Sequence, residues 1–147
     1  MPQNNRQDPY LNSRFVVEID GIADSGFSRV VLPESRLDLI EYREGTDPRV
    51  NRKLYGRPSF TTLILERGTG SSQVLSDWFR QAKDGGPGAR KNIRIVLQDD
   101  TGINVCIWQI SGAIPTRYAF ASLDATSGAV LLETLEIACE NVERAHL

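Results

Sequence analysis

The connection between two strand-like runs, residues 36–42 (RLDLIEY) and 59–66 (SFTTLILE), most constrains what this chain can fold into. A hairpin between two such strands needs only about two to five residues in its turn. This connection, residues 43–58, is much longer and carries five basic side chains against two acidic ones. It also contains Leu54 and Tyr55, which a free loop rarely needs, and long loops in compact domains are usually functional or disordered. We therefore expect an arm that docks on another copy of the protein; a mobile, solvated loop is the alternative.

The composition of the 147 residues fits a single domain, residues 1–147, in which 40% of the side chains are hydrophobic and can form a core. The formal net charge of −2 predicts no specific binding of nucleic acid and no attraction to an anionic membrane. We expect neither a secretion signal nor a membrane anchor, because no apolar run has the required length. Cys106 and Cys139 are expected to be reduced thiols, with a disulfide as the alternative.

Alternation of apolar and polar residues predicts a chain rich in β-strands. Residues 1–13 are polar and are expected to be extended, and turns rich in glycine and proline separate the strand-like segments. The expected strands cover residues 14–20, 28–32, 36–42, 60–66, 92–98, 103–111, 116–123 and 129–143. With one helix, these strands predict a mostly β protein, an antiparallel β-sandwich or small barrel with one flanking α-helix.

Helical periodicity is found in residues 71–86, SSQVLSDWFRQAKDGG. The apolar residues of this segment form one stripe at helical spacing; they are Val74, Leu75, Trp78, Phe79 and Ala82. We expect Trp78 and Phe79 to anchor the helix on the sheet rather than to bind a cofactor.

The C-terminal segment, residues 129–143, alternates strictly from Glu133 to Glu140, which favours a strand over the helix that it could also form. The alternation places Leu135, Ile137 and Cys139 on one face, which we expect to join the core. The opposite face carries Thr134, Glu136, Ala138 and Glu140.

The residue patterns of common enzymes are missing from this sequence. The single histidine, His146, stands next to the C-terminal residue, which excludes Ser-His-Asp and Cys-His schemes. The cysteines lack zinc-site spacing, and there is neither a P-loop nor a dinucleotide fingerprint. We expect no catalytic residue, cofactor or metal. An enzyme that uses Glu136 and Glu140 as paired carboxylates is the alternative that the residues leave open.

Short motifs along nearly the whole chain carry a family resemblance. They are DPY at residues 8–10, FVVEIDG at 15–21, GFS at 26–28, EYREG at 41–45, RKL at 52–54 with Gly56, LERG at 65–68, Leu75 with Trp78, IVLQDDTG at 95–102, Trp108 with Ala113 and Pro115, and ETLEIACENVER at 133–144. In this order they resemble the inner tail-tube proteins of contractile phage tails and phage-tail-like contractile injection systems. The chain departs from the family pattern at residues 47–52 and at Cys139.

This resemblance implies a ring-forming tail-tube fold. Hexameric rings would stack into a hollow tube that is driven through a target envelope and conducts cargo. The implied partners are further copies of the chain, a contractile sheath protein, baseplate or spike proteins, and tape-measure or terminator proteins. The protein would fold in the bacterial cytoplasm and become part of a phage tail or injection-system particle, extracellular after release.

Two surfaces are expected from the resemblance and the pattern together. The contact between subunits, with residues 43–58 as the loop between rings, is expected to use Asp8, Pro9, Tyr10, Glu41, Tyr42, Arg43, Glu44, Arg49, Arg52, Lys53, Leu54 and Tyr55. The lumen-facing residues are expected to be Thr134, Glu136 and Glu140, which would make the channel wall acidic. A small β-barrel ligand-binding or adaptor protein is the alternative function; it would need an apolar cavity within one chain.

Overall fold

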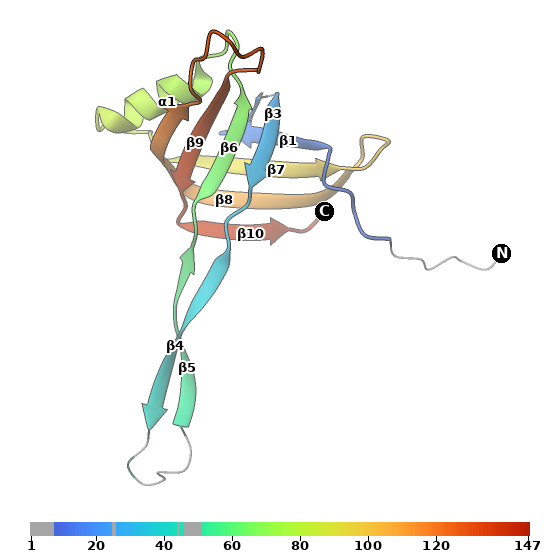
Figure 1. Ribbon diagram of the computed structural model, residues 1–147. Helices are drawn as coiled ribbons and strands as arrows, with labels where there is room; N and C mark the ends of the chain where they lie inside the picture. Colours follow the sequence, from blue (N-terminus) through green and yellow to red (C-terminus); the bar gives the residue numbers. More distant parts are fainter. Residues whose placement is uncertain (1–7, 25, 44, 46–50) are drawn as a thin grey trace, which may run out of the picture.

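The computed structural model describes residues 8–24, 26–43, 45 and 51–147, which form ten strands and one helix (Figure 1). In chain order the elements are β1 (Phe15–Ile19), β2 (Ile22–Asp24), β3 (Phe27–Val31), β4 (Ser35–Arg43), β5 (Asn51–Phe60), β6 (Leu63–Gly68), α1 (Val74–Lys83), β7 (Lys91–Gln98), β8 (Asn104–Phe120), β9 (Leu132–Ala138) and β10 (Asn141–Ala145). The predicted fold class, mostly antiparallel β with one helix, is confirmed.

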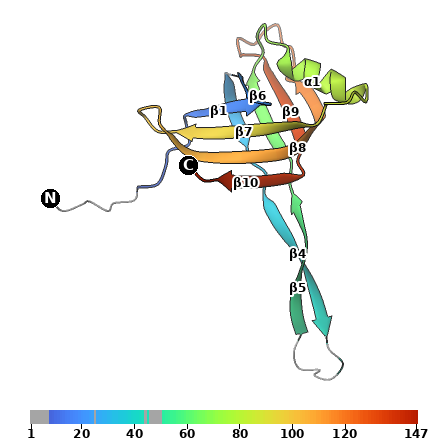
Figure 2. The same cartoon turned by 180° about the vertical axis from the view of Figure 1, so that it is seen from behind.

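The strands of the body form one antiparallel sheet that bends into two layers. The strand order is β2-β1-β7-β8-β9-β6-β3, and β10 also pairs with β8. The 17-residue strand β8 belongs to both layers, because its first part pairs with β7 and β10 and its last part pairs with β9. Strands β1, β7 and β10 run across the direction of β9, β6 and β3 (Figures 1 and 2). The two layers therefore pack as crossed sheets with the core between them.

Alternation along the strands fills the space between the layers. Leu63 and Leu65 of β6 and Leu135 and Ile137 of β9 are fully buried, and β1 and β7 contribute further aliphatic side chains to the same cluster. Each such side chain stabilises the fold by about 1.5–3 kcal/mol relative to an exposed one. The core positions predicted for Leu135 and Ile137 are thus confirmed, whereas Cys139 is partly buried at the margin of the cluster.

Helix α1 covers one side of this core (Figures 1 and 2). Leu75 and Trp78 are buried, and the indole Nε1 of Trp78 donates a hydrogen bond to the carbonyl oxygen of Ala89 over 2.5 Å. Phe79 is partly buried, with its ring centroid 6.0 Å from that of Tyr118. The two aromatic residues anchor the helix, as the periodicity predicts.

Strand β8 replaces two strands that were expected at residues 103–111 and 116–123. Gly112 has a φ of 62°. An L-residue with a side chain rarely adopts this conformation, and glycine adopts it without steric cost. The backbone bends there while its pairing continues from β7 onto β9. Gly112 lies between the two strands that the sequence predicts. In the structure it allows one continuous strand to pass from one layer to the other.

The expected strand at residues 129–143 is two strands in the structure. β9 ends at Ala138, and β10 begins at Asn141 and pairs with the first part of β8 in the other layer. In the connection between β9 and β10, the amide of Glu140 donates a hydrogen bond to the carbonyl oxygen of Ser111 of β8 over 3.0 Å. The alternation that favoured one strand ends at Glu140, where it is followed by a second polar residue, Asn141, and this change of phase marks the break.

Strands β4 and β5 pair with each other and project from the body as a separate hairpin (Figures 1 and 2). The loop expected at residues 43–58 differs from this structure, because from Asn51 onward the chain is strand, and Asn51 lies opposite Arg43. The high charge of this stretch concealed its strand character. Two residues of the expected interface, Glu44 and Arg49, lie outside the described residues.

Candidate subunit interface

The β4–β5 hairpin presents large apolar side chains to solvent in the single chain. About half or more of each is exposed, with Tyr55 reaching 80%; the set is Leu37, Leu39, Ile40, Tyr42, Leu54 and Tyr55. Contiguous exposed apolar surface marks a contact with another molecule. Tyr42, Leu54 and Tyr55 were expected in an interface from the sequence. The three aliphatic residues of β4 were not.

Charged side chains are interspersed with these apolar ones. Glu41, Arg52 and Lys53, all expected interface residues, are exposed on the same hairpin, and Glu41 lies opposite Lys53 in the register. The apolar residues supply area that leaves water on contact, and the charges supply specificity for the partner.

Gly56 lies beside an irregularity in the pairing of β4 with β5. The register shifts between Leu37 and Leu39, and a Cβ atom built at Gly56 would lie 2.8 Å from the Cβ of Asp38. The two strands thus approach too closely at this bulge for a side chain at position 56. Bulges increase the local twist of a strand pair, so we expect this bulge to influence the angle between the hairpin and the body.

The N-terminal segment forms a second projecting part. Residues 8–10, also expected in the interface, are exposed, and the segment leaves the body in a different direction from the hairpin (Figure 1). The carbonyl oxygen of Arg14 accepts a hydrogen bond from the amide of Gln98 over 2.8 Å, and its guanidinium donates to the carbonyl oxygen of Asp100 over 3.2 Å. Within one chain the expected interface residues therefore fall into two separate groups.

The residues expected on the channel wall do not share one surface. Thr134 and Glu136 lie on the face of β9 opposite its buried residues, and Glu136 pairs with Arg117 of β8 over 3.4 Å. Glu140 lies beyond the end of β9, where its side chain covers Gly112 and forms an ion pair with Arg90. The break between β9 and β10 separates Glu140 from the face that alternation assigned to it.

A buried ionic cluster was missed from the sequence. Arg67 of β6 is 4% exposed and donates from Nε to Glu133 of β9 over 2.5 Å and from Nη1 to Asp24 of β2 over 2.7 Å. The hydroxyl of Tyr118 donates to the other oxygen of Glu133 over 2.5 Å, and Ser72 lies 3.5 Å from the guanidinium. The available signal was parity, because Arg67 alternates with Leu63 and Leu65 and therefore points into the core.

The electrostatics of this cluster are those of a structural site. Burial alone would lower the pKa of Arg67, but the hydrogen bond to Glu133 and the charge of Asp24 outweigh it and raise the pKa. Burial, then the hydrogen bond to Glu133 and its charge, raise the pKa of Tyr118. The guanidinium also lies 5.3 Å from the centroid of the Phe27 ring. The cluster joins β2, β6, β8 and β9.

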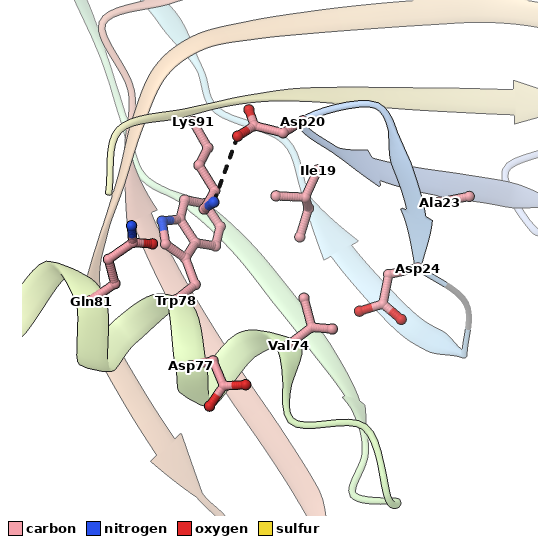
Figure 3. A pocket seen from close by; sticks show the side chains of 9 residues that line it. All are labelled: Ile19, Asp20, Ala23, Asp24, Val74, Asp77, Trp78, Gln81 and Lys91. Atoms are coloured by element: carbon pink, nitrogen blue, oxygen red, sulfur yellow. Dashed lines mark ion pairs between the residues drawn. The ribbon is translucent and has the colours of Figure 1, made fainter. Parts of the chain in front are cut away.

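A surface hollow of about 410 Å³ lies between α1 and the β1–β2 turn (Figure 3). Its wall is mixed, with Val74 and Trp78 beside Asp77 and an ion pair of 3.6 Å between Lys91 and Asp20. This hollow is open to solvent and is not the apolar cavity that a ligand carrier would need. In the part of the chain that the structure describes, no cluster of potential ligands could hold a metal, and no helix has the length and apolar character to cross a membrane.

A two-layer β domain with a filled core and an exposed apolar hairpin defines a class of protein, the subunit of a larger assembly. The family model described as T4-like virus tail tube protein gp19 matches residues 11–143, and the chain belongs to this family. No curated relative matches the chain.

Solved structures agree with this membership. A chain in the cryo-EM structure of the anti-feeding prophage baseplate is 26% identical, with 95% of this chain and 97% of that chain covered and a TM-score of 0.81. A chain of the sheath–tube complex of PVC, an extracellular contractile injection system, in its extended state is also 26% identical, with 95% and 93% covered and a TM-score of 0.84. Hcp1 from Flavobacterium johnsoniae shares the fold at 16% identity, with 89% and 94% covered and a TM-score of 0.55. The chain is a structural subunit of an inner tube and not an enzyme.

Proposed function

We propose that this chain forms hexameric rings that stack into a hollow tube, and that the β4–β5 hairpin and the N-terminal segment, residues 8–13, connect subunits of adjacent rings. The observation that carries the proposal is the hairpin itself, whose large apolar side chains are exposed in one chain and need a partner surface. Contact between rings is head-to-tail, because the hairpin of one copy meets a different part of the next.

Contacts within a ring would involve the edges of the sheet. Among the described residues, β2 and β3 end the strand order of the body sheet, and β10, which pairs only with β8, forms a further edge. Edge strands carry backbone groups that can pair with another chain, and a closed ring would use these groups productively. The body, residues 14–34 and 61–147, would thus form the ring, and the two projecting parts would join the rings.

Further partners are proposed from the assemblies that contain similar chains. Those structures are a sheath–tube complex, a baseplate, and a cap or tube terminator. We assign this chain corresponding partners: a contractile sheath protein around the tube, and baseplate or spike and tape-measure or terminator proteins at its ends. The protein would fold in the bacterial cytoplasm and leave the cell as part of the particle.

The channel wall is proposed to include Thr134 and Glu136, which lie on the face of β9 that points away from the core of the subunit. The pairing of Glu136 with Arg117 makes this face mixed in charge rather than uniformly acidic. A wall with both signs of charge, already paired, would bind a passing nucleic acid or protein only weakly. Glu140 is not needed for this wall, since its carboxylate is paired with Arg90 elsewhere.

Native mass spectrometry and negative-stain microscopy of the purified protein test the proposal. We expect masses at multiples of six chains of 16.4 kDa each, and rings or tubes in the micrographs. Monomers that persist at high concentration would contradict the proposal and would favour the alternative, a small β-barrel ligand-binding or adaptor protein. Rings with another number of subunits would contradict the hexamer alone.

A further inference from the structure

The register of the β4–β5 hairpin places an apolar pair on each of its faces. Leu39 lies opposite Tyr55, and Ile40 lies opposite Leu54. Residues opposite each other in a ladder share a face, and successive residues of a strand point to opposite faces. One face therefore carries Leu39 and Tyr55, and the other face carries Ile40 and Leu54.

The next pairs toward the tip add polar groups to both faces. Glu41 and Lys53 follow on the face of Tyr55, while Tyr42 and Arg52 follow on the face of Leu54. Each face therefore carries an apolar pair nearer the body and, nearer the tip of the hairpin, a pair that includes a charged side chain. This differs from β6 in the body, where buried residues alternate with less buried ones.

A hairpin that docked on one surface would leave an apolar face in water. An isolated two-stranded hairpin is at best marginally stable in water. All four residues of the two apolar pairs are about half exposed or more in the single chain. We infer that the β4–β5 hairpin is held between two different copies of this chain, one copy on each face; this inference rests on the proposed tube assembly.

Charge favours a second copy of the chain as the occupant of each face. Residues 35–60 contain six basic and four acidic side chains, a net charge of +2, so the rest of a chain with net charge −2 carries −4. The hairpin of one copy is therefore attracted to the body of another.

The shape of the molecule allows this contact to repeat. Residues 121–130, between β8 and β9, are exposed throughout and include Leu123 at 85% and Val130 at 71%. They lie at the opposite end of the molecule from the hairpin (Figures 1 and 2). Two neighbouring copies in the next ring can thus present this end to the two faces of one hairpin.

Diluted photo-crosslinking distinguishes one contacted copy from two. Chains carrying p-benzoylphenylalanine at Leu54, at Tyr55 or at both positions are co-assembled with a large excess of unlabelled chain, and the irradiated tubes are analysed by denaturing electrophoresis. Each single label should yield a crosslinked dimer. The double label should yield a trimer of one labelled and two unlabelled chains. The same set at Leu39 and Ile40, the partners of these residues on β4, provides a second, independent reading.

Several outcomes would overturn the inference. Doubly labelled chains that give only dimers would show that one copy covers both faces or that one face remains in water. A single label that enters tubes without crosslinking would show that its face is uncovered. In both cases tubes still form, so the proposed function would survive. Failure of the unlabelled chain to assemble would overturn both.

Discussion

Arg67 of β6 connects distant parts of the fold, since its side chain donates to Glu133 of β9, Asp24 of β2 and Ser72 in the segment before α1. Replacing it in Arg67→Met leaves Glu133 buried without its cation, which should destabilise the chain by about 3–5 kcal/mol. The double variant Arg67→Met with Glu133→Leu should recover part of this loss, because the more deeply buried carboxylate of Glu133 is gone and only Asp24, whose side chain is 14% exposed, is left without its cation. Urea unfolding of dilute, unassembled protein measures both variants. Equal stability of the double variant and Arg67→Met would contradict this account.

Tyr118 predicts how stability depends on alkaline pH. Its pKa is raised in the folded chain by burial and by Glu133, whereas the unfolded value is about 10. A raised folded-state pKa means that the contribution is fully present below pH about 10 and is lost as the pH rises further, because the unfolded chain releases the proton first. Urea unfolding from about pH 8 to about pH 11 measures the free energy of unfolding on both sides of this value. This free energy should decline less steeply with pH for Tyr118→Phe than for the unchanged chain. If the free energy of unfolding declined equally with pH in both proteins, Tyr118 would not be the source of the alkaline pH dependence.

At the scale of the element, the hairpin depends on the close approach of Gly56 to Asp38. A methyl group in Gly56→Ala would lie 2.8 Å from the Cβ of Asp38 and should force the strands apart or redirect the hairpin. Unfolding of the body should change little, whereas sedimentation should show far less tube. Gly70→Ala is the matched control, since no atom lies within 4 Å of its added Cβ. Normal tubes from the Gly56 variant would show that the angle of the hairpin is unimportant.

Strand β9 carries the proposed channel wall. A cysteine introduced by Glu136→Cys, in a background without Cys106 and Cys139, should react in assembled tubes with a small thiol reagent but not with a polymer-linked reagent too wide to enter. The ion pair between Glu136 and Arg117 lies at the surface, so its loss in this variant should cost at most about 1 kcal/mol of stability. Reaction with both reagents would place Glu136 on the outside of the tube.

Much of this architecture could be predicted from the sequence, because its elements follow local periodicity. The stripe around Trp78 identified α1, and alternation around Leu135 identified the core face of β9. The ionic cluster was not predictable in the same way. Arg67 and Glu133 are 66 residues apart, and only the register of β6 against β9 places them opposite each other.

The hairpin shows a different limit of prediction. The length and charge of residues 43–58 predicted an interface, but these residues were expected to form a loop, whereas from Asn51 onward they form strand β5. A strand that buries no face within its own chain lacks the one-sided pattern by which strands are recognised. The large apolar residues of β4 and β5 are exposed in the single chain, so the burial pattern that identifies a strand from the sequence is missing from this hairpin.

At the scale of the whole molecule, the chain separates into a body that contains the core and projecting parts that lie outside it. The core clusters within the two crossed layers, while the exposed apolar residues of the hairpin lie outside it. Stable protein contacts bury about 1,200–2,000 Å², and a tube subunit that meets several neighbours would gain this area several times. The rigidity of such a tube would thus arise from many contacts rather than from one strong contact.

A cryo-EM reconstruction of tubes assembled from the purified chain tests the central claim most directly. The account predicts stacked rings of six subunits in which the hairpin of each subunit reaches the adjacent ring and Leu54 and Tyr55 are both buried, against different copies. A reconstruction in which the hairpin lies in solvent, or packs only on its own ring, would contradict the account.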